Sequence, residues 1–319
     1  MPEIYKHIKL IEVYADIAGH RKGAALGLKA LRKSSAEINA EYYEKFEIEE
    51  IEQDGSVDEN CTYEHAKHID KVYPVISQLA EKVKQTRERN LFPIILAGDH
   101  SSCAGTMHGL KMAHPNDEIG VVYIDAHADI HTPYTSGSGN MHGMPLAIAC
   151  ALDNKENAIN QPNDAEVAYW DKMKYLVSDE ASIKPENIVF CALRDFQKEE
   201  DALIKKHKIP VYSVEEITYK GIQTVVEEIF KKLSYCKHIY ISFDVDSVDP
   251  LYVPGTGTPA KNGLSYEQAM QLNLELIKNE KVCCWEMAEI NPIYNNTEED
   301  STRVFKILEK VTDTLIKYY

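Results

Sequence analysis

Short apolar runs alternate with longer amphipathic segments along this chain, and this alternation constrains its fold more than any other feature. Seven runs have the length and composition of buried strands: residues 8–14, 94–97, 120–124, 188–193, 210–214, 239–243 and 282–288. Between them, apolar residues recur at helical spacing, as in residues 69–83, 225–233 and 304–315. Strands that alternate with helices predict an α/β fold whose mostly parallel sheet is covered on both faces. Since the alternation is continuous, we expect residues 1–319 to form one domain.

Composition and charge exclude two classes of partner. The chain has 51 Asp and Glu against 35 Lys and Arg, a formal net charge of -16, so it would repel nucleic-acid phosphates. No run approaches the ~18 consecutive apolar residues that span a membrane, and the first residues lack the apolar stretch of a secretion signal. The seven cysteines match no zinc-site spacing, and we interpret them as reduced core residues of a cytoplasmic protein.

Residue types that bind metals directly follow four of the predicted strands. Asp125, His127 and Asp129 occupy alternate positions after the run 120–124, so an extended chain would direct all three to one side. The other three strand ends carry His100, the pair Asp244 and Asp246, and Glu289. Ligands of open parallel sheets bind beyond the carboxyl ends of the strands. We therefore expect these side chains to meet at one edge of the sheet.

The candidate metal ligands comprise two imidazoles and four carboxylates: His100, Asp125, His127, Asp129, Asp244 and Asp246. One open catalytic zinc ion normally has three protein ligands, so this larger set suits two divalent ions that share carboxylates. Oxygen-rich mixed ligands favour Mn²⁺, while Fe, Co and Ni stay open. Two ions roughly 3.5–4 Å apart can lower the pKa of a shared water, which makes hydrolysis of a planar, electrophilic carbon or phosphorus the natural reaction.

A metallophosphoesterase is the rival interpretation of such a ligand set. Those enzymes also place Asp-x-His and Asn-His pairs on strand ends, but Asp-x-His usually comes first and Gly-Asn-His later. Here Gly98-Asp99-His100 precedes Asp125-Ala126-His127, and the chain has no Gly-Asn-His. The order of the motifs therefore argues against a phosphoesterase.

Taken together, the motifs resemble those of the ureohydrolase family, which includes arginases, agmatinases and formiminoglutamases. The resemblance covers most of the chain and is closest to arginase. It is carried by the glycine-rich segment 19–27, Gly98-Asp99-His100-Ser101, and the segments 125–133, 242–246 and 289–292. It implies a three-layer α/β/α fold, a site for two Mn²⁺ ions and a homotrimer or homohexamer.

The resemblance also assigns the metal ligands. It implies that Asp125 and Asp244 bridge the two ions. The remaining ligands would be His100 with Asp129 for one ion, and His127 with Asp246 for the other.

Three residues take catalytic roles from the same resemblance. The hydroxide between the metals would attack the guanidinium carbon, with Asp129 hydrogen-bonded to that hydroxide and Glu289 paired with the guanidinium. The motif of residues 138–145 is the most arginase-like part of the chain, and its histidine in arginases shuttles protons to the leaving amine. His142 would take that role, for which an imidazole titrates in the right range.

Six further residues are implied at the substrate end of the pocket: His131, Ser138, Asn140, Gln197, Glu200 and Thr258. Two of them depart from the family pattern, since arginases generally have Asn at the position of His131 and Asp at the position of Gln197. A Gln in place of Asp removes a charge partner for an ammonium group, and a His in place of Asn adds a bulkier donor. The departures leave the metal chemistry intact and put the identity of the substrate in question.

We therefore predict a binuclear manganese hydrolase, an arginase that converts L-arginine and water to L-ornithine and urea. The first alternative keeps the chemistry and changes the substrate to another guanidino or formimidoyl compound, as in agmatinases and formiminoglutamases. The second is a non-catalytic family member, against which the complete ligand set, His142 and Glu289 all argue.

Overall fold

Eight parallel strands form one sheet in the computed structural model of the chain, which describes residues 5–54, 62–294 and 298–318. The order across the sheet is β2-β1-β3-β8-β7-β4-β5-β6, and all neighbours are parallel. The strands are β1 Ile8–Tyr14, β2 Glu47–Glu52, β3 Phe92–Ala97, β4 Ile119–Ile124, β5 Ile188–Cys191, β6 Val211–Tyr212, β7 His238–Asp244 and β8 Val282–Ala288. The prediction of a mostly parallel sheet is confirmed.

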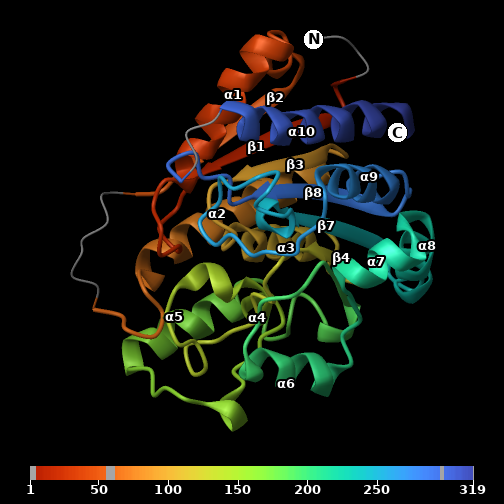
Figure 1. The fold of residues 1–319 in the computed structure, drawn as a ribbon. Coiled ribbons are helices and arrows are strands. Elements are labelled where there is room, and N and C mark those ends of the chain that lie inside the picture. Colours follow the sequence, from red (N-terminus) through yellow and green to blue (C-terminus); the bar gives the residue numbers. More distant parts are fainter. Residues whose placement is uncertain (1–4, 55–61, 295–297, 319) are drawn as a thin grey trace.

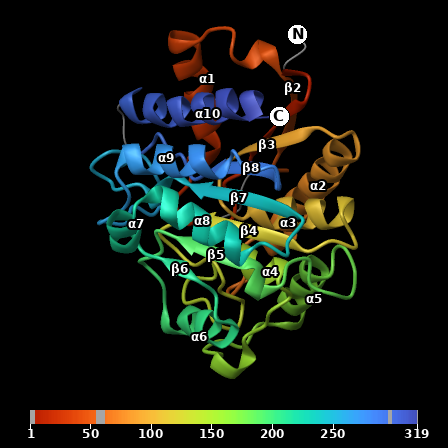
Figure 2. The same ribbon diagram turned by 90° about the vertical axis from the view of Figure 1, so that its right-hand side faces the viewer.

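Ten α-helices of the described residues cover the two faces of the sheet, so the fold has three layers, α/β/α (Figures 1 and 2). One face packs against α2 Ile69–Glu88, α3 Ser102–Ala113, α4 Pro145–Ala149, α5 Asp164–Lys174 and α6 Lys198–His207. The other packs against α1 Gly27–Ile38, α7 Val214–Lys220, α8 Ile222–Lys232, α9 Tyr266–Leu276 and α10 Glu298–Tyr318. The first and last helices lie side by side at one end of the sheet (Figure 1). Among the described residues, no helix is both long and apolar enough to cross a membrane.

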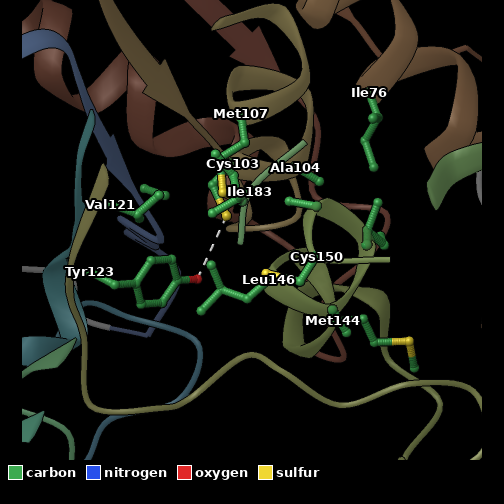
Figure 3. Close-up of a cluster of buried hydrophobic side chains, with 14 of the residues drawn as sticks. Ile76, Cys103, Ala104, Met107, Val121, Tyr123, Met144, Leu146, Cys150 and Ile183 are labelled. Atoms are coloured by element: carbon green, nitrogen blue, oxygen red, sulfur yellow. Dashed lines mark hydrogen bonds between the residues drawn. The ribbon is translucent and has the colours of Figure 1, made fainter. Parts of the chain in front are cut away.

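The central strands are apolar because both of their faces are covered. Every residue of β3 and β4 is buried, as parallel strands between two helical layers require. Alternate side chains of β4 enter opposite cores, Val121 and Tyr123 on one side and Val122 on the other. Figure 3 shows Val121 and Tyr123 directed from β4 toward Cys103 of α3, whose Sγ lies 3.7 Å from the Tyr123 hydroxyl. β4 therefore contacts α3 near the carboxyl end of the strand.

The structure corrects the predicted strands at one edge of the sheet. β2 was not predicted, because its sequence Glu-Ile-Glu-Glu-Ile-Glu is acidic and spaces its two isoleucines three apart rather than two. As an edge strand it pairs only with β1 and buries only Ile51, so its glutamates remain free to meet basic side chains. Arg89, for example, binds Glu47 at 2.7 Å.

The predicted strands near the other edge are shorter than expected. The run 188–193 ends at Cys191 as β5, because Ala192 adopts a left-handed backbone conformation with φ 68°. The run 210–214 forms only the two-residue strand β6, since Val214 already begins α7. Neither change affects the four central strands β3, β8, β7 and β4, which are neighbours and place their carboxyl ends together.

Candidate metal and substrate site

The chain turns sharply where two of the central strands end. Asp129, after β4, has φ 47°, and Glu289, directly after β8, has φ 68°. A left-handed conformation costs a non-glycine residue about 1–2 kcal/mol, so the surrounding contacts must hold both residues in place. The extended arrangement expected for residues 125–129 is therefore wrong at Asp129. The turn nevertheless brings the Asp129 carboxylate back to the other strand ends.

Three carboxylates converge on the His100 imidazole. Its Nδ1 lies 3.0 Å from Asp125 Oδ2, 3.2 Å from Asp129 Oδ2 and 3.1 Å from Asp244 Oδ2. A single ring N–H can donate to one of these oxygens, so an imidazole alone does not satisfy the group. All four residues are buried, and His100, Asp125 and Asp129 are close enough together to hold a metal ion.

Asp125 joins this group to a second one centred on His127. The His127 Nδ1 lies 3.0 Å from Asp246 Oδ2 and 3.5 Å from Asp125 Oδ1. Asp125 thus faces His100 with one carboxylate oxygen and His127 with the other. Within the part of the chain that the structure describes, its buried Oδ2 accepts no hydrogen bond. Asp244 contacts the first group through Oδ2, while its Oδ1 accepts the Asp246 N–H at 2.7 Å.

The electrostatics of the cluster favour added positive charge. Burial raises the pKa of Asp125 to about 6, and the charges of Asp246 and Asp129 act in the same direction. Burial also raises the pKa of Asp244 well above its usual range. Burial alone would lower the pKa of His127, but Asp246 and Asp125 outweigh it and raise that pKa far above its ordinary value. Divalent cations would neutralise these carboxylates, and a set of carboxylates with imidazoles suits Mn²⁺.

Two hydroxyl groups, which sequence reasoning missed, hold the ligands in place. The Tyr123 hydroxyl donates to Asp129 Oδ2 at 2.8 Å and lies 3.0 Å from His100 Nδ1. Ser242 Oγ lies 2.7 Å from His100 Nε2 on the other side of the ring. In the sequence, Tyr123 belongs to an apolar run that predicts only a strand. The available signal was its hydroxyl, since a buried tyrosine beside a strand end needs a polar partner.

His142 and Glu289 are in direct contact. The His142 Nδ1 lies 3.1 Å from Glu289 Oε1, which also accepts a hydrogen bond from the backbone N–H of His100 at 2.9 Å. Burial would lower the pKa of His142, but the hydrogen bond and charge of Glu289 outweigh it and raise the pKa to about 9. The imidazole is therefore protonated at neutral pH and can donate a proton.

A cavity of about 650 Å³ opens above the cluster. Its walls include all six residues expected at the substrate end: His131, Ser138, Asn140, Gln197, Glu200 and Thr258. His100 and Asp125 are fully buried and do not line the cavity. His20, Arg21, Asp195 and Phe196 also line it and were not predicted. The first two follow Gly19 in the glycine-rich segment, and the last two precede Gln197, so their sequence neighbours were the only signal.

The substrate end of the cavity contains a closely spaced acid and imidazole. His131 Nε2 lies 3.3 Å from Glu200 Oε2, which also accepts the Gln197 N–H at 2.9 Å. Burial raises the pKa of Glu200 to about 8 and lowers that of His131. Near neutral pH this pair therefore carries little charge, while the carboxylate of Asp195 lines the same cavity. Thr258 donates to the proposed ligand Asp246 at 3.0 Å.

Comparisons with known proteins identify the relatives of this chain. A family model described as the arginase family matches residues 6–311. The chain is 31% identical over 309 residues to the arginase of Bacillus subtilis (strain 168), covering 96% of this chain and 97% of that protein. A crystal structure of Bacillus subtilis arginase matches with a TM-score of 0.81 at 30% identity, covering 96% of this chain and 98% of that one. Entamoeba histolytica arginase in complex with L-ornithine matches with a TM-score of 0.81 at 27% identity, covering 98% of both chains.

These matches agree with the three-layer fold. The chain belongs to the arginase family and is an enzyme of the ureohydrolase type, which acts on guanidino or amidine groups.

Proposed function

We propose that this chain is an arginase, which hydrolyses L-arginine to L-ornithine and urea at a centre of two Mn²⁺ ions. The observation that carries the proposal is the position of Asp125, whose two carboxylate oxygens face two separate groups of ligands. One ion would then be held by His100 and Asp129 and the other by His127 and Asp246, with Asp125 and Asp244 shared. Two bound ions would lower the pKa of a shared water and supply hydroxide near neutral pH.

The side chains above the cluster have the properties that the rest of the reaction requires. Glu289 offers a carboxylate to the guanidinium, a planar cation that such a group can bind through two parallel hydrogen bonds. Asp129, fixed by the Tyr123 hydroxyl, would orient the attacking water. His142, protonated below a pKa of about 9, would donate the proton that the leaving amine needs.

A panel of substrates tests the proposal. Urea release is measured with added Mn²⁺ on L-arginine, agmatine, guanidinobutyrate and related compounds. We expect L-arginine to have the highest kcat/KM. If L-arginine is a poor substrate beside any of the others, the arginase assignment fails while the ureohydrolase chemistry stands. Asp129→Ala should lose bound metal and activity together, which a metal count on the same sample checks.

The substrate end favours a second candidate, a guanidino or formimidoyl substrate other than arginine. Gln197 stands at the exposed mouth of the cavity, and His131 and Glu200 carry little charge near neutral pH. A substrate without an α-amino group would suit this pair, because it needs no anionic partner at His131 and Glu200.

Gln197→Asp distinguishes the two candidates. If the pocket binds arginine, the new carboxylate gains an ion pair with the substrate ammonium, worth about 0.2–1 kcal/mol or roughly a 1.4- to 5-fold lower KM. Gln223→Asp, on the exposed side of α8, adds the same charge outside the cavity and should leave KM unchanged. An unchanged KM for L-arginine in Gln197→Asp would show that the pocket is organised for another substrate.

We also propose that the protein is cytoplasmic, as its reduced cysteines suggest, and that it assembles as a homotrimer or homohexamer, as its family resemblance implies. Sedimentation equilibrium measures the assembly directly, and a monomer at micromolar concentration would contradict this expectation.

A further inference from the structure

Three side chains that bind metals also meet at the edge of the sheet opposite the catalytic cavity. His114 directly follows α3, His238 is the first residue of β7, and Asp117 lies in the turn between α3 and β4. The proposed catalytic ligands lie at the other ends of the same elements, His100 just before α3 and Asp244 at the end of β7. A 12-residue helix is about 18 Å long and a seven-residue strand about 23 Å. The two groups of ligands are therefore far apart.

The geometry of the three side chains is compact. One ligand atom from each of His114, Asp117 and His238 lies within 4.8 Å of the other two. The two imidazole rings stack with their centroids 3.7 Å apart, and His238 Nε2 lies 3.2 Å from Asp117 Oδ2. Tetrahedral zinc separates its nitrogen and oxygen ligands by about 3.3 Å, so small side-chain rotations would suffice to close this group around an ion.

Backbone hydrogen bonds and strand pairing bring the three side chains together. The Asp117 N–H donates to the His114 carbonyl at 3.1 Å, which closes the turn and brings the two side chains to the same side. His238 pairs with Ile119 at the start of β4, so the neighbouring strand places its imidazole beside them. The side chains of Asp117 and His238 are each about one-fifth exposed, at 22% and 21%, so an ion can reach them from solvent.

The His114 ring has one nitrogen available to bind an ion. Across the described residues, the buried Nε2 of His114 makes no hydrogen bond. Burial lowers the pKa of His114 to about 4 and lowers that of His238, so both rings are neutral at physiological pH with a lone pair available. A bound cation would satisfy the unused nitrogen, which otherwise remains a cost to the fold.

The surrounding charges decide which cations fit. Lys237 Nζ lies 2.6 Å from Asp117 Oδ1, which leaves Oδ2 to bind the ion. Arg87 adds positive charge near both imidazoles. Attraction by net charge is therefore weak, and coordination by imidazole must provide the affinity. Two imidazoles with one carboxylate select Zn²⁺, Ni²⁺ or Cu²⁺ over Mg²⁺ and Mn²⁺. This preference differs from that of the carboxylate-rich catalytic cluster.

We propose that His114, Asp117 and His238 bind a zinc-class divalent cation at a peripheral site that ties the end of α3 to the start of β7. Because the ion binds the folded chain, it stabilises the fold without touching the substrate.

Counting metal ions tests the proposal. The full-length protein is stripped with a chelator, equilibrated with Zn²⁺ alone and analysed for bound zinc per chain. The wild-type protein should bind one more zinc ion than the double variant His114→Gln/His238→Gln. Because the result is a difference between two chains, it holds whatever number of ions the catalytic cavity takes, so this proposal and the proposed function can fail separately.

His207→Gln is the matched control, since it removes a half-buried histidine at the end of α6. It should bind as much zinc as the wild-type protein. Equal zinc in the wild-type protein and the double variant, or an equal loss in the control, overturns the proposal. Should the double variant fail to fold, Asp117→Asn replaces it. That variant should bind the additional ion more weakly, and wild-type affinity in it would also overturn the proposal.

Discussion

At the scale of single residues, the Tyr123 hydroxyl contacts both His100 and Asp129. Tyr123→Phe keeps the buried ring and removes only this hydroxyl. Groups that orient metal ligands typically contribute 10- to 100-fold to metal affinity, so we expect a loss of about that size for Mn²⁺. Titration of metal-free protein with Mn²⁺ measures it. Tyr240→Phe is the control, because that buried hydroxyl donates to Glu286 instead. A Tyr123→Phe chain with wild-type affinity would contradict the expected role of the hydroxyl.

The contact between His142 and Glu289 leads to a prediction about pH. Glu289 holds the pKa of His142 at about 9, above its usual value, so the imidazolium is present below that pH and is lost above it. If His142 protonates the leaving amine, kcat/KM falls as the pH rises past about 9. His142→Ala should remove this fall and lower kcat by about 10²- to 10⁴-fold while both metal ions stay bound. Turnover by His142→Ala at the wild-type rate would exclude the proton-donor role.

At the scale of elements, two glycines allow α3 to lie close against α2. A Cβ at Gly105 would meet the Ile76 carbonyl oxygen at 2.7 Å, and one at Gly109 would meet Val83 Cβ at 2.7 Å as well as the Ala80 carbonyl oxygen. The two positions are one helical turn apart, so both face α2. This close packing matters for the site, because α3 begins just after His100.

Gly109→Ala tests the packing of these two helices. Alanine favours a helix over glycine by about 1 kcal/mol, whereas overpacking against a backbone carbonyl costs about 1–3 kcal/mol. We expect a net loss of up to about 2 kcal/mol in the free energy of unfolding, measured by chemical denaturation of the metal-free protein. Lys232→Ala, at an exposed position of α8, should change it by less than about 0.5 kcal/mol. A stabilised Gly109→Ala would mean that the helices adjust without cost.

At the scale of the whole molecule, the buried carboxylates make stability depend on metal and on pH together. Burial raises the pKa of Asp125 to about 6 and raises that of Asp244, whereas an unfolded Asp titrates near about 3.9. Protonated in the folded state, these groups contribute stability that is complete below pH of about 4 and is lost as the pH rises through about 6. A divalent cation takes the place of those protons.

The gain in melting temperature on adding Mn²⁺ should therefore be larger at about pH 8 than at about pH 5. A ligand at about 1,000 times its Kd stabilises the fold by about 4 kcal/mol. Thermal unfolding of chelated and manganese-loaded protein at both pH values measures the difference. Asp129→Ala is the control, in which the gain should shrink at both pH values. A gain that is larger at the lower pH would contradict this account.

Much of the fold and many of the candidate ligands could be predicted from the sequence, because the informative patterns are local. Alternating apolar runs and helical segments predicted the parallel sheet and the helices on its faces, and each proposed ligand lies at the end of a strand or within five residues after it. For example, the candidate ligands between Asp125 and Asp129 come immediately after the strand-like run 120–124 in the chain. β2 was not predicted, because an edge strand buries few side chains and its acidic sequence therefore lacks the apolar pattern of a buried strand.

The tertiary structure decided what depends on residues far apart in the chain. That Asp125 faces two histidines, and that Ser242 reaches His100 across 142 positions, follows only once β3, β4 and β7 are set in order. The Tyr123 hydroxyl and the group of His114, Asp117 and His238 arise in the same way. Apolar periodicity reports which face of an element is buried. The partner of a buried polar atom is set by the packing of whole elements, and no local pattern contains that information.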